Sequence, residues 1–211
     1  MSDHISRIVT VLEVGFGNLP SLKRVLRQIN TEVKIARTVN DIVDANHLII
    51  PGVGAFGTAM DFLKFNNFEQ ALRHRCLDMK LPTLGICLGA QIMLEVGFEG
   101  GDKAGLAIFA GTVESLESSA GIGVTHTGWD KVEFNNNFLG INKYSTVDTF
   151  FNHDFVLIPK DTNEIYGTCG YGNGFAVALN KFKTFAVQFH PEKSQLAGLN
   201  MLKHFLEIDN V

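Results

Sequence analysis

A cysteine between two glycines is the residue of this sequence whose setting first suggests chemistry. Cys87 lies in Gly85-Ile86-Cys87-Leu88-Gly89, after the apolar stretch 81–84 and before the stretch 90–95, whose composition favours a helix. This order predicts a strand, a sharp turn and a helix, the arrangement that presents the nucleophile in many hydrolases. The turn leaves little room for a Cβ, which suits the glycines. N–H groups at the helix start would favour a thiolate, and that of Leu88 could donate to an oxyanion. The alternative is a buried structural cysteine.

A histidine and a glutamate near the end of the chain could activate this cysteine. His190, Pro191 and Glu192 follow a β-type stretch. Proline disfavours the helical conformation in the residue before it, so we expect His190 to be extended and to project to the same side as Glu192. His190 would act as the base and Glu192 would orient it. Taken singly, the histidine could be structural and the glutamate a solvated surface charge.

A second glycine-rich segment, 51–57, follows another predicted strand and begins Pro51-Gly52-Val53-Gly54. Three glycines in seven residues predict a loop whose backbone approaches a ligand closely. Val53 is stiff because it is β-branched, and it lies between glycines that can turn either way. A peptide flip there could move an N–H into or out of an oxyanion hole.

The pattern of elements predicts an α/β fold that would bring these segments to one sheet edge. Strands are expected at 8–12, 33–36, 47–50 and 184–189, and helices at 19–29, 40–45, 58–64, 68–79 and 197–208, with turns or loops at 15–18 and 97–105. Between 108 and 155 the segments are short, β-like and interrupted, one of them at 122–124, and 166–169 with 175–179 reads as a hairpin. We expect a mostly parallel central sheet with helices on both faces and a smaller antiparallel β section.

Composition excludes several classes of function. The chain has 211 residues, 45% hydrophobic and 19% charged, with a net charge of -4, which gives no basic surface for nucleic acid. The three cysteines form no C-x-x-C pair, so neither a zinc motif nor a disulfide framework is predicted, and a reducing cytoplasm fits best. No signal peptide or membrane-spanning stretch is recognisable. We expect a single domain, 1–211, with no metal, cofactor, nucleic-acid or membrane partner.

The three motifs together resemble those of the triad-type class I glutamine amidotransferases, which have a flavodoxin-like fold. Within that class, segments 51–57 and 189–194 and the sequence His126-Thr127-Gly128-Trp129 resemble the glutaminase subunits of imidazole glycerol phosphate synthase. The likeness runs nearly from end to end of the chain. It implies hydrolysis of L-glutamine to L-glutamate and ammonia, and transfer of the ammonia to a separate (β/α)8-barrel cyclase subunit, which makes imidazole glycerol phosphate and AICAR in histidine biosynthesis.

The resemblance also implies roles for individual residues. Cys87 would attack the glutamine side-chain amide, with His190 as base and Glu192 orienting it. The oxyanion would be held by backbone N–H groups of the glycine loop and of the residue after the nucleophile: Val53, Gly54 and Leu88. Glutamine itself would be bound by Gly52, Gln91, His153, Asp154 and Phe155. The cyclase would contact Asn18, Trp129, Asp130 and Lys193.

Some positions depart from the pattern of that family, and they lie outside the triad. They include Glu13, Pro20, Asp130, Phe150 and Asp154. Such changes leave other functions open: the same glutaminase chemistry feeding a sugar-amidating enzyme of surface polysaccharide synthesis, or a free-standing γ-glutamyl cysteine hydrolase. A non-enzymatic alternative is a flavodoxin-like domain in which Cys87 senses oxidants.

Overall fold

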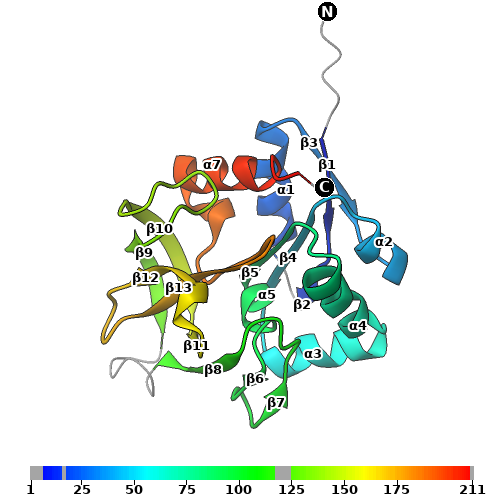
Figure 1. The fold of residues 1–211 in the computed structure, drawn as a ribbon, viewed down its shortest axis with the longest axis horizontal. Helices are drawn as coiled ribbons and strands as arrows, with labels where there is room; N and C mark the ends of the chain where they lie inside the picture. The colour runs from blue at the N-terminus through cyan, green and yellow to red at the C-terminus, as the bar shows by residue number, and fades with distance from the viewer. Residues whose placement is uncertain (1–6, 16–17, 117–124, 210–211) are drawn as a thin grey trace, which may run out of the picture.

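The computed structural model describes residues 7–15, 18–116 and 125–209. Part of the predicted turn at 15–18 and the predicted β segment at 122–124 lie outside them. The described chain forms one continuous mixed sheet flanked by helices (Figure 1). This confirms the predicted α/β class, and the antiparallel strands continue the parallel ones without a break. None of the described helices is long and apolar enough to cross a membrane.

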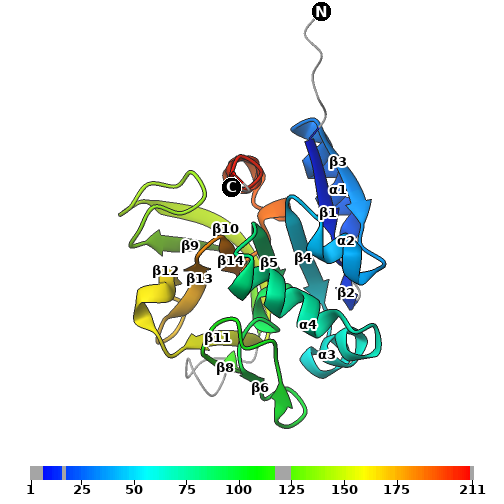
Figure 2. The same cartoon turned by 45° about the vertical axis from the view of Figure 1, so that its right-hand side comes forward.

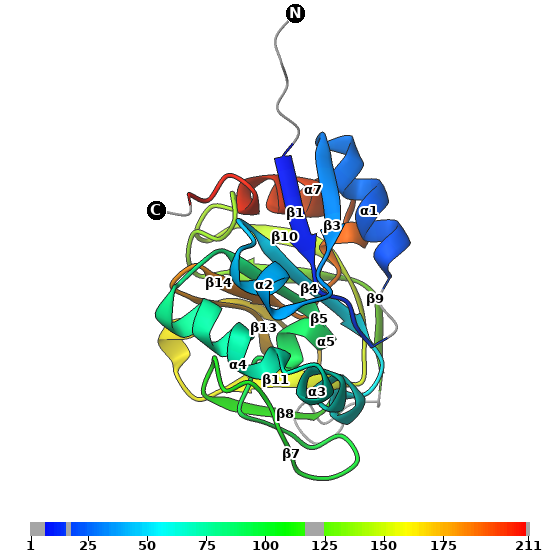
Figure 3. The same ribbon diagram turned by 90° about the vertical axis from the view of Figure 1, so that its right-hand side faces the viewer.

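The parallel half of the sheet has the strand order β3-β1-β4-β5-β14, and Figure 3 views it from the β3 edge. These strands are β1 (Arg7–Val11), β3 (Thr31–Ile35), β4 (Leu48–Val53), β5 (Thr83–Cys87) and β14 (Thr184–Val187), and the short β2 (Val14–Gly15) pairs with the end of β4. The strand predicted at 47–50 therefore runs on to Val53. Pro51 and Gly52 stay in the strand because β5 pairs with them on one side while β2 pairs with Gly52 on the other. The glycine loop is correspondingly shorter than predicted.

Helices cover both faces of this half. On one face α1 (Leu19–Gln28) and α7 (Gln195–Phe205) lie beside each other, and their apolar residues share a cluster with Val9, Val11 and Ile49 (Figures 1 and 2). On the other face lie α2 (Val39–Val43), α3 (Phe56–Phe65) and α4 (Phe68–Arg73), and the chain continues from α4 into the π-helix η1 (His74–Asp78). The helices predicted at 19–29, 40–45, 58–64, 68–79 and 197–208 are thus present, with ends displaced by a few residues.

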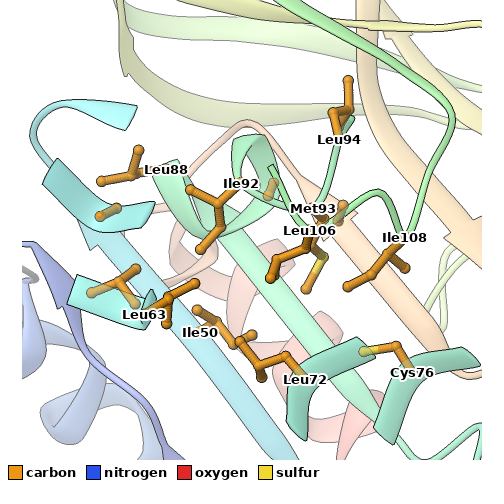
Figure 4. Packing of buried hydrophobic residues seen from close by; sticks show 14 of the residues in the cluster. Ile50, Leu63, Leu72, Cys76, Leu88, Ile92, Met93, Leu94, Leu106 and Ile108 are labelled. Carbon is orange, nitrogen blue, oxygen red and sulfur yellow. The ribbon is translucent and has the colours of Figure 1, made fainter. Parts of the chain in front are cut away.

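The helix predicted at 90–95 is wrong. Only α5 (Leu88–Gln91) is helical, a single turn after Cys87. Its apolar continuation turns into the core, where Ile92 and Met93 pack near Leu106 and Ile108 (Figure 4). The carbonyls of Ile92 and Met93 accept from the N–H groups of Leu106 and Ile108, at 2.8 and 2.9 Å, so the returning chain occupies them and the helix ends.

The antiparallel half begins at β14, which pairs with β13 (Phe175–Lys181). It continues through β11 (Phe155–Pro159) and β8 (Gly111–Ser115) to β6 (Val96–Gly97), which is parallel to β8, and β7 (Lys103–Ala104). A branch from β13 consists of β12 (Ile165–Cys169), β9 (His126–Phe134) and β10 (Thr146–His153). A 3-10 turn, η2 (Thr162–Glu164), precedes β12. The predicted hairpin is confirmed as β12 and β13. The prediction of short, interrupted segments is wrong, because β9 and β10 are nine and eight residues long. The predicted loop at 97–105 contains the short strand β7.

A buried arginine fixes the start of the strand that carries Cys87. The guanidinium of Arg75 on η1 is fully buried and donates to the carbonyls of Ile42, Ala45 and Pro82 at 2.7 to 2.9 Å. Its Nε donates to the hydroxyl of Thr83 at 3.0 Å. These bonds join the end of α2, the start of β5 and η1 in one buried network.

Candidate active site

Cys87 is the last residue of β5, and α5 begins immediately after it. Its φ of 53° and ψ of -111° lie outside the regions that residues with side chains normally occupy, and such strain is concentrated at functional sites. A Cβ on Gly85 would lie 2.6 Å from the carbonyl oxygen of Gly89, and one on Gly89 would lie 1.7 Å from that of Ile50. The prediction that the turn leaves no room for either Cβ is therefore confirmed.

The predicted base and carboxylate lie just beyond the end of the neighbouring strand, β14. β14 is parallel to β5, with Val187 opposite Ile86, and the chain then leads to His190. His190 is extended, as predicted, but Pro191 to Lys193 form a 3-10 turn, η3, rather than an extended chain. Within this turn His190 Nδ1 donates to Glu192 Oε1 at 2.8 Å, and both side chains are buried.

The charge of His190 is set by its two neighbours. Burial opposes the imidazolium, but the sulfur of Cys87 and the carboxylate of Glu192 outweigh it and raise the pKa of His190 to about 9. His190 Nε2 is buried and makes no hydrogen bond that fixes it elsewhere in the described chain. It is therefore free to exchange a proton with the sulfur.

Two residues that the sequence interpretation missed hold this arrangement in place. Ser194 Oγ donates to the carbonyl of His190 at 2.7 Å and accepts from the N–H of Phe150 at 3.0 Å. Gln188, fully buried, places its Nε2 3.8 Å from Cys87 Sγ and accepts from Gln91 Nε2 at 3.3 Å. A polar residue in the otherwise apolar run 185–189 was a usable signal for Gln188.

A cavity of about 340 Å³ opens beside the sulfur of Cys87. It is lined by Val53, Gly54, Ala55, Cys87, Leu88, Gln91, Glu99, Asn152, His153, Asp154 and Phe155. The structure thus gathers most of the residues predicted to bind glutamine or an oxyanion, and adds Ala55, Glu99 and Asn152. The size suits one small polar molecule.

Gly52 is the predicted binding residue that does not line this cavity. A Cβ there would lie 2.8 Å from the carbonyl oxygen of Val14 and 3.2 Å from the Cβ of Leu88, so Gly52 lets β2 and α5 pack closely against β4. Gly54, which does line the cavity, has a φ of 114°, a conformation that favours glycine.

A pair of histidines supports one wall of the cavity. His153 Nδ1 donates to the carbonyl of Phe155 at 2.9 Å, and Gln91 Nε2 donates to the same oxygen at 3.0 Å. His126 lies behind, with its Nδ1 3.2 Å from His153 Nε2. Burial, with smaller contributions from His126 and His190, lowers the pKa of His153 to about 3, so its ring is neutral.

Of the residues predicted to face a partner protein, Trp129 and Lys193 both lie against the ring of Phe150. Trp129 is 49% exposed and meets Phe150 edge-on at 6.0 Å, and Lys193 Nζ lies 5.1 Å from the centre of the Phe150 ring. Asp130 points to the opposite side of β9, toward His126. Asn18 precedes α1 and makes no side-chain cap.

Comparison with known proteins identifies the family of this chain. The family described as "Glutamine amidotransferase class-I" matches residues 10–208. A solved structure entitled "Crystal structure of glutamine amidotransferase" superposes with a TM-score of 0.73 at 22% identity, over 94% of this chain and 97% of that one. The chain belongs to the class-I glutamine amidotransferase family.

Curated relatives of the chain identify a smaller family within this class. The chain is 38% identical to "Imidazole glycerol phosphate synthase subunit HisH" of Moorella thermoacetica over 96% of this chain and 95% of that protein, and 35% identical to that of Rhodopirellula baltica over 94% and 96%. It also matches, at 38% identity, "Imidazole glycerol phosphate synthase hisHF, chloroplastic" of Arabidopsis thaliana, of which it spans only 34%. Within the class, the chain belongs to the HisH family.

Proposed function

We propose that this chain is the glutaminase subunit of an imidazole glycerol phosphate synthase and acts in histidine biosynthesis. It hydrolyses L-glutamine to L-glutamate and ammonia. The observation that carries the proposal is the meeting of a strained cysteine with a histidine–glutamate pair, at the ends of adjacent parallel strands and beside a cavity of amino-acid size.

The first half of the reaction forms a thioester. Cys87 Sγ attacks the amide carbon of glutamine, and His190 holds the proton that the thiol gives up. The negative oxygen of the tetrahedral intermediate is held by the N–H of Leu88 and by one N–H of the segment Val53–Gly54. The C–N bond then breaks as His190 passes its proton to the departing nitrogen, which leaves as ammonia.

The second half releases glutamate. His190 takes a proton from water, the resulting hydroxide attacks the thioester carbon, and the C–S bond breaks to return the cysteine. Glu192 keeps Nδ1 of His190 in its donor role throughout, so that Nε2 faces the reacting atoms. Gln91, His153, Asp154 and Phe155 would hold the amino-acid end of glutamine in the cavity.

The ammonia acceptor is a second part of the proposal. A (β/α)8-barrel cyclase subunit would bind this chain as a heterodimer and use the ammonia to make imidazole glycerol phosphate and AICAR, so that the lyase chemistry resides in the cyclase. Support comes from the Arabidopsis relative, whose name joins HisH and HisF and of which this chain spans 34%. The three free thiols also suit a reducing cytoplasm.

The test is glutamate release from glutamine, measured with the cyclase of the same organism and its bound acceptor. Cys87→Ser should abolish turnover while leaving the fold and cyclase binding intact, and His190→Ala should be about as damaging. Glu192→Gln should be milder, because the base remains. The matched control is Cys76→Ser, a buried cysteine outside the site. Normal turnover by Cys87→Ser would refute the mechanism.

The same assay separates the alternatives. Full activity of the lone chain would favour a free-standing hydrolase. Activation by a sugar-amidating enzyme, and not by the cyclase, would mean that the chain supplies ammonia for a different pathway. Its glutaminase reaction would be the same.

A further inference from the structure

Three potential metal ligands come together on the inner face of β9 and β12, outside the triad. His126 and Asp130 are four residues apart on β9 and therefore lie on the same side of the sheet. Cys169, on β12, pairs with Val132 of β9 and so lies diagonally across from Asp130 on that side. His126 Nε2 and Asp130 Oδ2 are 3.3 Å apart, and one ligand atom of each of the three residues lies within 4.8 Å of the others.

Hydrogen bonding fixes which nitrogen of His126 faces this cluster. The Phe155 carbonyl can only accept, so His153 must donate to it from Nδ1, and the neutral ring of His153 then accepts at Nε2. His126 must therefore donate from Nδ1. Nε2 is therefore the nitrogen that faces the Asp130 carboxylate, 3.3 Å from Oδ2. A proton on Nε2 or a bound cation can bridge these two atoms.

Thr149 adds a further oxygen on the same side. It lies directly opposite Asp130 in the pairing of β10 with β9, so both side chains leave the sheet in the same direction. Its side chain is fully buried, and its hydroxyl has no hydrogen-bond partner among the described residues. An unpartnered buried hydroxyl beside the cluster is costly unless a water or an ion engages it.

We propose that His126, Asp130 and Cys169 form a binding site for a zinc-type divalent cation, with the hydroxyl of Thr149 placed to bond a metal-bound water. Imidazole, carboxylate and thiolate are the three ligand types of protein zinc sites, and the thiolate excludes Mg²⁺ and Ca²⁺. His153 acts as the partner that orients the ligating histidine through its second nitrogen.

Binding at this site displaces a proton. A cysteine binds zinc as its thiolate, so a Cys169 thiol must lose its proton when the ion binds. The S–H proton leaves to solvent as the S–metal bond forms, and one proton is released for each ion bound. The affinity should then rise by about tenfold per pH unit in the neutral range.

The site is separate from the catalytic cysteine but shares a wall with the substrate cavity. His153 contacts His126 and also lines the cavity beside Cys87. A bound ion would fix His126, and through it the position of His153.

The experiment uses the full chain with Cys87→Ser, so that the catalytic thiol does not bind metal. Co²⁺ is titrated first, following the charge-transfer absorption of a cobalt–thiolate bond, and Zn²⁺ is then measured by competition with a chromophoric chelator, with Mg²⁺ as the negative control. We expect one equivalent of Co²⁺ or Zn²⁺, no response to Mg²⁺, and a higher melting temperature with zinc.

Three further variants in this background decide whether the named residues are the ligands. Cys169→Ala should abolish the charge-transfer absorption, and Asp130→Asn, of nearly the same shape, should weaken zinc binding at least tenfold. Cys76→Ala should change neither. Circular dichroism without metal checks that each variant folds. The proposal is overturned by the absence of a cobalt–thiolate signal in Cys87→Ser, by its persistence in Cys169→Ala, or by unchanged zinc affinity in Asp130→Asn.

Discussion

The side-chain amide of Gln188 lies 3.8 Å from the sulfur of Cys87 and accepts a hydrogen bond from Gln91. It therefore links the nucleophile to a residue of the cavity wall, which also donates to the carbonyl of Phe155. Because Gln188 is fully buried, neither contact can be replaced by bulk water. This amide positions two parts of the site at once.

Replacing Gln188 by leucine keeps the volume of the side chain and removes its amide. The lost contact with the sulfur and the unpaired Gln91 should lower kcat/KM for glutamine by about tenfold or more, equivalent to roughly 1.4 kcal/mol. Steady-state kinetics with the cyclase present measures this loss. Gln70→Leu, on the exposed side of α4, is the matched control. Wild-type kinetics in Gln188→Leu would rule out a positioning role.

Gly89→Ala should prevent correct folding of the nucleophile turn. The added Cβ would lie 1.7 Å from the carbonyl oxygen of Ile50, so β4 and α5 would have to separate. We expect loss of glutaminase activity and a free energy of unfolding lower by more than about 3 kcal/mol. Gly170→Ala, where the Cβ meets no atom within 4 Å, should be nearly neutral. Chemical denaturation compares the two, and equal stability would contradict the packing of the turn.

The raised pKa of His190 predicts how stability depends on pH. Its pKa is about 9 in the folded chain against an ordinary value of 6.5. The charged imidazolium of His190 therefore adds to the free energy of unfolding. This contribution is fully present below about pH 6.5 and is lost as the pH rises through about 9. Urea unfolding of wild type and His190→Gln across this range should show the stability advantage of the wild type shrinking with pH. An advantage that grows with pH would reverse the sign and contradict the charge assignment.

Arg75→Met should destabilise the fold with little effect on the chemistry. The change removes the guanidinium donor from the buried carbonyls of Ile42, Ala45 and Pro82, of which Pro82 keeps the N–H of Leu48, and should cost about 3 kcal/mol or more. Arg24→Met, on the exposed side of α1, should cost less than about 0.5 kcal/mol. Urea denaturation gives both values, and glutaminase activity per folded molecule should be retained below the transition. A loss for Arg75→Met no larger than that for Arg24→Met would contradict a structural role for the network.

Trp129 is the single tryptophan of the chain, so its fluorescence reports on its own surroundings. If the cyclase covers the Trp129–Phe150–Lys193 cluster, titration with the cyclase should change a signal that Trp129→Phe lacks. Trp129→Ala should weaken binding by about 2 kcal/mol, roughly thirtyfold in Kd. Tyr144→Ala, an exposed aromatic outside this cluster, is the control. An unchanged Kd in Trp129→Ala would place the partner elsewhere.

The lone chain should be a poor glutaminase. We expect the cyclase with its acceptor to raise kcat by about a hundredfold or more. A peptide flip at Val53 would bring one N–H donor into the oxyanion hole, and one such donor contributes about that factor to the rate. Gly54, with a φ of 114°, gives that segment a conformation that other residues adopt with strain. Measurement of kcat with and without the partner decides the matter, since full activity of the lone chain would mean that the hole is already formed.

The sequence was informative where a role depends on residues close together in the chain. Cys87 between its glycines and His190 two residues before Glu192 are local patterns, and the structure brings them to neighbouring strand ends. Gln188 and Ser194 were missed because their partners, Cys87 and Phe150, are distant in sequence and meet only through the sheet.

The errors in the elements have the same origin. The stretch 90–95 has the composition of a helix, but carbonyls of Ile92 and Met93 bond to the chain returning at Leu106 and Ile108. Pro51 and Gly52 predict a loop, but neighbouring strands hold them in β4. In each case a tertiary contact overrides the local preference for a type of secondary structure. The short stretch of sequence around the element does not reveal that contact.

The pairing of β5 with β14 has a consequence for how such a chain can diversify. Cys87 and His190 are 103 positions apart (190 minus 87), yet one hydrogen-bonded ladder sets the distance between them. Most of the chain between β5 and β14 lies outside this pair of strands, in other helices and strands. Insertions or deletions within β8 to β12 can therefore reshape the surface offered to another enzyme while the spacing of nucleophile and base stays the same. If the cyclase covers the Trp129–Phe150–Lys193 cluster, this arrangement lets much of the partner surface change while Cys87 and His190 keep their spacing.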